Sequence, residues 1–428
     1  MKTYGECFAC DDCNKEFPLT LQLTVCPSCG GLLEIRYNLA AMKKELKALV
    51  LNEKERSIWR YRRMLPYVDD DNIVSLGEGC TPLIRSNHIG EKFGIRELYF
   101  KNDTMMPTGS FKDRGFSLAI SYAKQIGVRR AFTYSSGNAG ASFAAYSARS
   151  LFPSLVCVEY TASDAKKAMI MLYGERTAVL YFESFKEINE MLKAAAEELQ
   201  LYQFVNFINP IRHEAMKTYA YEIYEDIGKA PDVMIHPVGT GGGIWGALKG
   251  FNELAELGFT DKKPRMFAVQ PEDCAHYKEA FNRGAREAGC FGNAGKTIAQ
   301  SIACDSPFHK GRRVLKAIYE TGGAALGVTD GEILEAMRDL AKEGIAAEPS
   351  AAVSLAAFKK TAEQGIIKSD ESVVCVITGS ALKQPQAVEM AAGIPKLSLK
   401  ANIADLRRVL EEAGMLRLLT ACHLYAKG

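Results

Sequence analysis

Residues 107–115 read Pro107-Thr-Gly-Ser-Phe-Lys-Asp-Arg-Gly115 and join a predicted strand to a predicted helix. Ser110 and Asp113 have the S-x-x-D spacing of a capping box, which places Lys112 in the first turn of that helix. The positive end of the helix dipole and partial burial both lower the pKa of a lysine, and a lysine that forms a Schiff base needs a low pKa. The alternative is a solvated surface lysine without a catalytic role.

Two further junctions between a strand and a helix are rich in small residues. Ser135-Ser-Gly-Asn138-Ala-Gly-Ala-Ser142 follows the apolar run AFTY, and its backbone amides suit an anion such as a carboxylate. His236-Pro-Val-Gly239-Thr-Gly-Gly-Gly-Ile-Trp-Gly246 follows DVMIHPV, and its backbone amides suit a phosphate. Each stretch has an alternative: a tight turn for the first, and a nicotinamide site for the second.

The nicotinamide alternative depends on a dinucleotide motif in the second stretch. Gly241, Gly243 and Gly246 satisfy G-x-G-x-x-G, and Glu272 follows the next strand, where the acidic residue of such a site is expected.

Outward from these junctions, short apolar runs alternate with longer segments of helical periodicity. This alternation predicts an α/β fold with a mostly parallel sheet, helices on both faces and a ligand at the carboxyl ends of the strands. The predicted strands are residues 98–101, 131–134, 155–160, 177–182, 203–207, 232–238, 265–270 and 372–378, and the predicted helices are residues 39–51, 117–125, 141–150, 187–201 and 211–227.

The cysteines are spread unevenly, because five of the twelve lie among the first 29 residues. Cys10-Asp-Asp-Cys13 and Cys26-Pro-Ser-Cys29 are two CxxC knuckles at the spacing of a zinc ribbon. Cys7 is an alternative to Cys10 as a ligand, and a disulfide pair, a redox pair and an iron–sulfur site are alternatives to zinc. Four protein ligands leave no open position on the metal, so we expect a structural site.

Composition excludes several classes of protein. Apolar residues make up 47% and charged residues 24%, with a formal net charge of +2, which is typical of a soluble globular protein and argues against a nucleic-acid partner. Residues 1–37 carry three basic and five acidic side chains, which is unsuited to phosphate backbones. No apolar run is long enough to span a membrane, and the start MKTYGECFAC lacks a signal-peptide core, so we expect a cytoplasmic protein.

Taken in this order, the junctions resemble the fold-type II family of pyridoxal-phosphate enzymes and, within it, the threonine synthases that carry a cysteine ribbon. The resemblance covers nearly the whole chain. The motifs that carry it are Ser75-Leu-Gly-Glu-Gly-Cys-Thr-Pro-Leu83, the stretch 107–115, Ser135-Ser-Gly-Asn138, Asn206-Phe-Ile-Asn209-Pro-Ile-Arg212, Glu348-Pro-Ser-Ala-Ala352 and Thr378-Gly-Ser-Ala-Leu-Lys383.

The resemblance implies the cofactor pyridoxal 5′-phosphate, and the cysteine spacing predicts a structural Zn²⁺ bound by Cys10, Cys13, Cys26 and Cys29. It implies that Lys112 binds pyridoxal phosphate covalently and moves protons, and that Asn138 bonds the 3′-oxygen of the ring. The remaining cofactor contacts that it implies are Phe111, the amides of Gly239, Thr240, Gly241, Gly242 and Gly243, and Thr378 opposite the ring nitrogen. The substrate contacts that it implies are Lys101, Ser110, Ser135, Ser136, Ala139, Arg212 and Lys217.

The implied reaction is that of a carbon–oxygen lyase acting on a phosphate ester, in which O-phospho-L-homoserine and water give L-threonine and phosphate. The partner is then a small phosphorylated amino acid. A serine/threonine dehydratase or a β-replacement enzyme of the same fold is the nearer alternative, and an NAD-dependent dehydrogenase is the distant one. The sequence departs from the family pattern at positions beside the substrate, namely Met106, Ala139, Thr240, Gly243 and Ser380.

The implied architecture is similar to that of tryptophan synthase β, with two α/β subdomains and an N-terminal zinc ribbon. We expect the ribbon at residues 1–37, a large domain at residues 38–126 and 211–428, and a small domain at residues 127–210, with the cofactor in the cleft. The resemblance also implies a homodimer.

Overall fold

The computed structural model describes residues 4–46, 48–49, 54–135, 137–160, 163–174, 177–182, 185–205, 208–291, 297–304, 306–392, 398 and 400–412. The chain divides into two units, residues 1–391 and residues 392–428. The first unit holds three sheets, and the described part of the second contains helix α15 (Ile403–Glu412).

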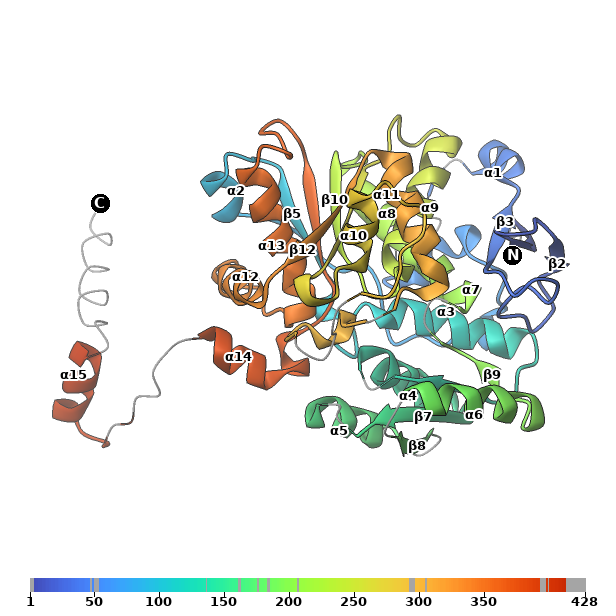
Figure 1. Ribbon diagram of the computed structural model, residues 1–428, viewed down its shortest axis with the longest axis horizontal. Helices are drawn as coiled ribbons and strands as arrows, with labels where there is room; N and C mark the ends of the chain where they lie inside the picture. The colour runs from blue at the N-terminus through green and yellow to red at the C-terminus, as the bar shows by residue number, and fades with distance from the viewer. Residues whose placement is uncertain are drawn as a thin grey trace. The chain divides into compact units, whose positions relative to one another are not determined.

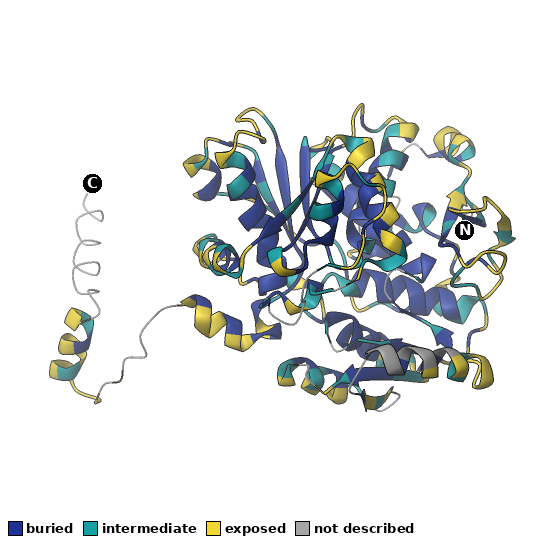
Figure 2. Ribbon diagram, in the orientation of Figure 1, coloured by how far each residue is buried: buried dark blue, intermediate teal, exposed yellow. Residues whose placement is uncertain are grey.

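The main sheet has six strands in the order β12-β11-β10-β13-β5-β4, all parallel except for the antiparallel pair β4 and β5. Its strands are β4 (Leu83–Arg85), β5 (Leu98–Asn102), β10 (Val233–Pro237), β11 (Arg265–Pro271), β12 (Ala324–Val328) and β13 (Val373–Ile377). Successive side chains point to opposite faces, so Met234 packs in one apolar cluster while Val233 and Ile235 pack in the other. Both faces are therefore buried (Figure 2).

Helices cover both faces of this sheet (Figure 1). The first face packs mainly against α8 (Thr218–Ile227), α9 (Gly242–Leu257) and α11 (Arg312–Thr321), and the second against α12 (Asp330–Lys342) and α13 (Pro349–Glu363). The shorter helices of the first unit are α1 (Leu39–Glu45), α2 (Ile89–Lys92), α7 (Pro210–Glu214) and α10 (His276–Asn282), and α14 (Pro385–Ala392) follows the last strand. Within the described residues, no helix has both the length and the apolar character needed to cross a membrane.

A second parallel sheet has four strands in the order β8-β7-β6-β9. Its strands are β6 (Ala131–Tyr134), β7 (Ser154–Glu159), β8 (Thr177–Phe182) and β9 (Tyr202–Gln203), with helices α3 (Lys112–Gln125), α4 (Asn138–Ser150), α5 (Asp164–Leu172) and α6 (Phe185–Glu198) between or beside them. The strand predicted over 203–207 is thus shorter and begins earlier, and residues 206–207 lie outside the described residues. The division of the chain into domains at 127 and 210 stays a prediction.

The N-terminal residues form a small antiparallel sheet in the order β2-β1-β3. Strand β1 spans Gly5–Cys10, β2 spans Glu16–Pro18 and β3 spans Leu33–Tyr37. We call residues 4–37 the ribbon.

Three further features differ from the sequence predictions. The helix predicted over 39–51 is α1, which ends at Glu45. Strand β12, with the sequence AALGV, was not predicted, because alanine and glycine are weak strand formers and the strand depends on pairing with β11. The single helix predicted over 211–227 consists of α7, a 3₁₀ turn (Ala215–Lys217) and α8.

A buried ionic cluster anchors α3 to the sheet. The fully buried guanidinium of Arg114 bonds Asp103 at 3.0 Å and Glu222 at 2.9 Å. The ammonium of Lys101, at the end of β5, lies 2.9 Å from the same Glu222. The cluster therefore ties the first turn of α3 to β5 and to α8.

We predict that Arg114→Met lowers the free energy of unfolding by about 3–5 kcal/mol, because it leaves two carboxylates buried with one partner fewer. The control Lys229→Met breaks the exposed pair with Glu97 and should cost less than about 1 kcal/mol. Urea unfolding followed by circular dichroism measures both, and equal losses would contradict the role of the cluster.

Candidate active site

Helix α3 begins with Lys112 at the carboxyl end of the main sheet. The backbone amide of Phe111 donates a hydrogen bond of 2.9 Å to the carbonyl of Thr378, which directly follows β13. Gly109 has φ +74, a left-handed conformation that favours glycine. The sequence thus brings Lys112 beside the end of the central strand β13.

The predicted capping box is wrong. The carboxylate of Asp113 accepts hydrogen bonds from the amide and the hydroxyl of Thr108, both at 2.7 Å, rather than capping with Ser110. The hydroxyl of Ser110 is buried and has no hydrogen-bond partner among the described residues.

The electrostatic expectation for Lys112 agrees with the structure. Burial and the neighbouring charge of Arg212 lower the pKa of Lys112 to about 7. Its Nζ lies 4.3 Å from the centre of the Phe111 ring, and within the described residues it has no ion pair or hydrogen bond. An amine with such a pKa is about half neutral near pH 7, and the neutral form is nucleophilic.

Lys112 lines a cavity of about 620 Å³, which we call the cofactor cavity. Most of the predicted cofactor and substrate residues line it with Lys112, and they come from the segments that follow five different strands. They are Phe111, Ser135, Asn138, Ala139, Arg212, Gly239, Thr240, Gly241, Gly242, Gly243 and Thr378.

The glycine-rich loop connects β10 to α9 and leaves its backbone amides at one wall of the cavity. Gly241 has φ +88, and a Cβ on Gly243 would lie 2.3 Å from Cε1 of His236. His236 is buried, and burial lowers its pKa to about 4, so its ring is neutral. Nδ1 of His236 lies 2.9 Å from the carbonyl oxygen of Pro237. A carbonyl oxygen can only accept a hydrogen bond, so Nδ1 carries the ring proton and donates it. The loop can approach an anion closely because Gly243 makes room for this ring.

A carboxylate that the sequence analysis did not select lies beside Asn138. Nδ2 of Asn138, the first residue of α4, donates a hydrogen bond of 2.7 Å to Glu348, which is 1% exposed. Ser301 donates to the other oxygen of Glu348 at 3.3 Å. Oδ1 of Asn138 is buried without a partner among the described residues. Glu348 opens one of the family-like motifs, and that was the available signal for it.

The structure does not bring Lys101 or Lys217 to the described lining of the cavity. Both side chains are fully buried in ion pairs: Lys101 with Glu222, and Lys217 with Glu214 at 2.8 Å and Glu253 at 3.0 Å. Each ammonium is already neutralised by carboxylates, so neither lysine is placed to bind a substrate phosphate.

The two remaining predicted substrate residues are serines. Ser110 is buried and pairs through its backbone with Gly379, outside the described lining of the cavity. Ser136 lies outside the described residues.

Two other cationic side chains line the cavity with Lys112. Arg212 lies with its guanidinium 4.1 Å from the centre of the Phe116 ring and donates to the carbonyl of Phe204 at 3.0 Å. Lys166, on α5, is 3% exposed, and its ammonium donates to Ser301 at 3.1 Å. No sequence signal distinguishes Lys166, because Lys166 and Lys167 stand together on an ordinary amphipathic helix.

The four cysteines predicted as metal ligands converge in the ribbon. The sulfur atoms of Cys10, Cys13, Cys26 and Cys29 all lie within 4.8 Å of one another. The closest pairs, Cys10 with Cys29 and Cys13 with Cys26, are 3.5 and 3.6 Å apart. Four thiolates about 2.3 Å from a central Zn²⁺ would be about 3.8 Å apart, so the donor set fits a tetrahedral metal. Cys7 is not part of this group.

Comparison with known proteins supports the interpretation of the cavity. Residues 74–379 match the family described as pyridoxal-phosphate dependent enzyme. The chain is 40% identical to a threonine synthase of Methanocaldococcus jannaschii over 406 residues, which cover 94% of this chain and 99% of the relative. It is 34% identical to a threonine synthase of Methanosarcina acetivorans, over 94% of this chain and 98% of the relative.

The fold is similar to that of solved enzymes. Maize serine racemase superposes with a TM-score of 0.61 at 21% identity, over 73% of this chain and 92% of that chain. A processed threonine deaminase from Solanum lycopersicum gives 0.60 at 21% identity, over 79% and 84%. These likenesses confirm the predicted fold-type II architecture, and the matches do not favour a dehydrogenase. The chain therefore belongs to the pyridoxal-phosphate-dependent enzyme family and, within it, to the threonine synthases.

Proposed function

We propose that this protein converts O-phospho-L-homoserine and water into L-threonine and phosphate. The observation that carries the proposal is the position of Lys112, whose pKa is lowered, in the wall of the cofactor cavity. The glycine-rich loop and the cationic side chains of Arg212 and Lys166 line the same cavity. The threonine synthases among its relatives, similar over almost their whole length, support the same reaction.

The described residues fit pyridoxal phosphate. When bound, this cofactor supplies a conjugated ring that stabilises negative charge beside Cα of an amino acid. Lys112 would hold it through Nζ, and the amides of residues 239–243 would bind its phosphate. Asn138, whose buried Oδ1 has no partner among the described residues, would orient the ring from one side, and Thr378 would face the ring nitrogen.

Lys112 then moves the protons of the reaction. Its neutral amine accepts the proton from Cα of the substrate and afterwards one from Cβ, and its ammonium form returns protons at Cγ and Cα. Phosphate leaves from Cγ, the hydroxyl of water is added at Cβ, and the remaining proton of this water goes to the released phosphate, so one water is consumed for each phosphate released. Burial of the amine keeps its pKa near the operating pH, which suits a group that both accepts and donates.

Arg212 and Lys166 are the side chains that we assign to the substrate phosphate. They line the cavity, whereas Lys101 and Lys217 are enclosed by carboxylates elsewhere. Arginine offers a planar fork and lysine a point charge, and both form strong charge-assisted hydrogen bonds with phosphate oxygens. Ser135, at the start of the α4 junction, would receive the substrate carboxylate.

The cysteine group of the ribbon would bind Zn²⁺ with Cys10, Cys13, Cys26 and Cys29 as ligands. Its four thiolates leave no open position, so the metal would stabilise the ribbon and take no part in the reaction. A homodimer and a cytoplasmic location stay predictions.

The proposed reaction predicts that purified protein with pyridoxal phosphate releases phosphate and threonine from O-phosphohomoserine in equal amounts, without a ketoacid. Lys112→Ala should lower the rate by at least about 10³-fold, because it removes the group that moves the protons. Lys124→Ala, on the same helix but outside the cavity lining, is the matched control. Ketoacid formation from serine or threonine without phosphate release would contradict the proposal.

The phosphate assignment predicts that Lys166→Met raises KM for O-phosphohomoserine by about 10- to 100-fold, the value of one charge-assisted hydrogen bond. Lys167→Met is the matched control, because Lys167 pairs with Asp164 at 2.9 Å and does not line the cavity. Steady-state phosphate release measures both variants. An unchanged KM in Lys166→Met would show that another residue binds the phosphate.

The ribbon assignment predicts one Zn²⁺ per chain by elemental analysis of the purified protein. Cys13→Ser should lose the metal and unfold at lower temperature, because a structural zinc site contributes folding energy. Cys7→Ser should keep both the metal and the unfolding temperature, since Cys7 is outside the group. Metal loss in Cys7→Ser alone would reverse the ligand assignment.

A further inference from the structure

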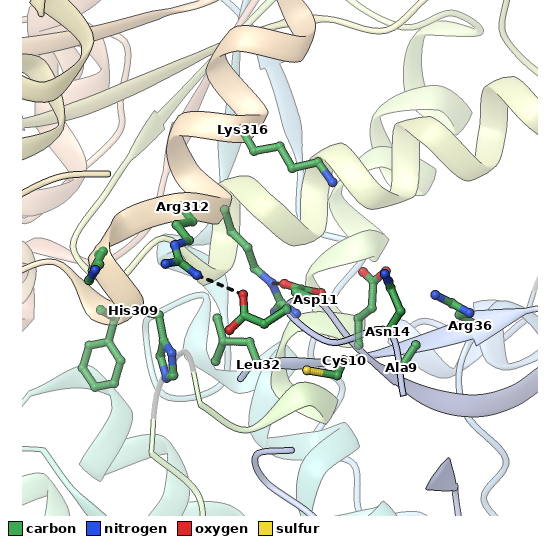
Figure 3. Close-up of a pocket in the computed structure, with 14 residues that line it drawn as sticks. Ala9, Cys10, Asp11, Asn14, Leu32, Arg36, His309, Arg312 and Lys316 are labelled. Carbon is green, nitrogen blue, oxygen red and sulfur yellow. Dashed lines mark hydrogen bonds and ion pairs between the residues drawn. The ribbon is translucent and has the colours of Figure 1, made fainter. Parts of the chain in front are cut away.

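The first knuckle of the ribbon contacts the start of α11. Asp11 and Asp12 lie between two of the clustered cysteines, and Arg312 and Arg313 are the first residues of α11. Asp12 pairs with Arg312 at 3.0 Å, and Asp11 pairs with Arg313 at 2.5 Å. Figure 3 shows Asp11 on the ribbon facing the turn that carries Arg312.

The two adjacent ion pairs differ in their surroundings. The side chains of Asp12 and Arg312 are 42% and 50% exposed, whereas the side chain of Arg313 is 3% exposed. The guanidinium of Arg313 also lies 5.4 Å from the centre of the Trp245 ring. An exposed pair contributes little, but a buried guanidinium is held firmly by its acceptors.

Arg313 reaches two acceptors besides Asp11. Nη2 donates to the carbonyl of Leu33 on β3 at 3.0 Å, and Nη1 lies 3.1 Å from Nδ1 of His213. A guanidinium has donors only, so Nδ1 of His213 accepts this bond and the ring proton resides on Nε2. The buried guanidinium thus sets the tautomer of a histidine on another element.

His213 belongs to the wall of the cofactor cavity. It follows Arg212 on α7, is 4% exposed and lines the cavity with Arg212. A second cavity, of about 490 Å³, lies between the ribbon and α11 and is lined by Asp11 and Arg313. Phe308 lines both cavities, so only a thin wall separates the ribbon contact from the candidate active site.

We propose that Arg313 is a positioning residue of the active site, held by Asp11 of the ribbon, and that it fixes His213 as a neutral ring with its proton on Nε2. The ribbon then contributes to the geometry of the cavity wall that carries Arg212, in addition to any effect on stability. The inference rests on the proposed function only for the identity of the ligand in the cavity.

The test compares Asp11→Ala with Asp12→Ala in the full-length holoenzyme. Both changes remove one carboxylate from the same knuckle, but only the first removes the partner of Arg313. The chain has six histidines, so nitrogen spectra of histidine-labelled protein resolve the rings, and His213→Gln assigns the signal. We expect His213 to keep one tautomer in the wild type and in Asp12→Ala, and to become a mixture in Asp11→Ala.

A second variant, Arg313→Met, removes the donor itself and should give the same mixture of tautomers. In both Asp11→Ala and Arg313→Met, kcat/KM for O-phosphohomoserine should fall about tenfold or more, because small misplacements in an active site are costly. Zinc content should equal that of Asp12→Ala. An unchanged His213 tautomer in Arg313→Met, or equal kinetic losses in the Asp11 and Asp12 variants, would overturn the proposal. The tautomer measurement needs no turnover, so it remains decisive even if the proposed reaction is wrong.

Discussion

The buried guanidinium of Arg114 determines where the chemistry of this protein is located. It lies two residues after Lys112 on α3, and its carboxylate partners, Asp103 and Glu222, come from the segment after β5 and from α8. A buried charge without partners is strongly unfavourable, so these elements are stable only together. Once they are assembled, Lys112 has no freedom to leave the carboxyl end of the sheet. The low pKa of its amine follows from the burial that this arrangement imposes.

The parts of the site that could be predicted from the sequence are those whose functional groups all lie within one continuous stretch of the chain. The glycine loop is such a stretch, and so is the segment around Lys112. Lys101 and Lys217 lie outside the described lining of the cavity for the opposite reason. The partner of Lys101, Glu222, lies on α8, more than a hundred positions away, and Lys217 pairs with Glu253 on α9 as well as with Glu214, three positions before it. A lysine is a ligand or a structural cation according to its partners, and local sequence does not reveal partners that tertiary folding supplies.

The features that the sequence analysis missed share this dependence on distant contacts. Strand β12 exists because β11 offers it hydrogen bonds, since its own alanines and glycine do not favour a strand. Lys166 and Lys167, like Arg312 and Arg313, are adjacent residues of the same type with different surroundings. Lys166 and Arg313 are buried, whereas Lys167 and Arg312 are more exposed. The orientation of each helix determines which of the two neighbouring side chains is buried.

The contact between Gly243 and His236 has a consequence for the glycine-rich loop. A Cβ at position 243 would lie 2.3 Å from Cε1 of the buried imidazole, so any side chain there requires the ring of His236 to move. The orientation of this ring and the closeness of the glycine-rich loop to the cavity are therefore coupled.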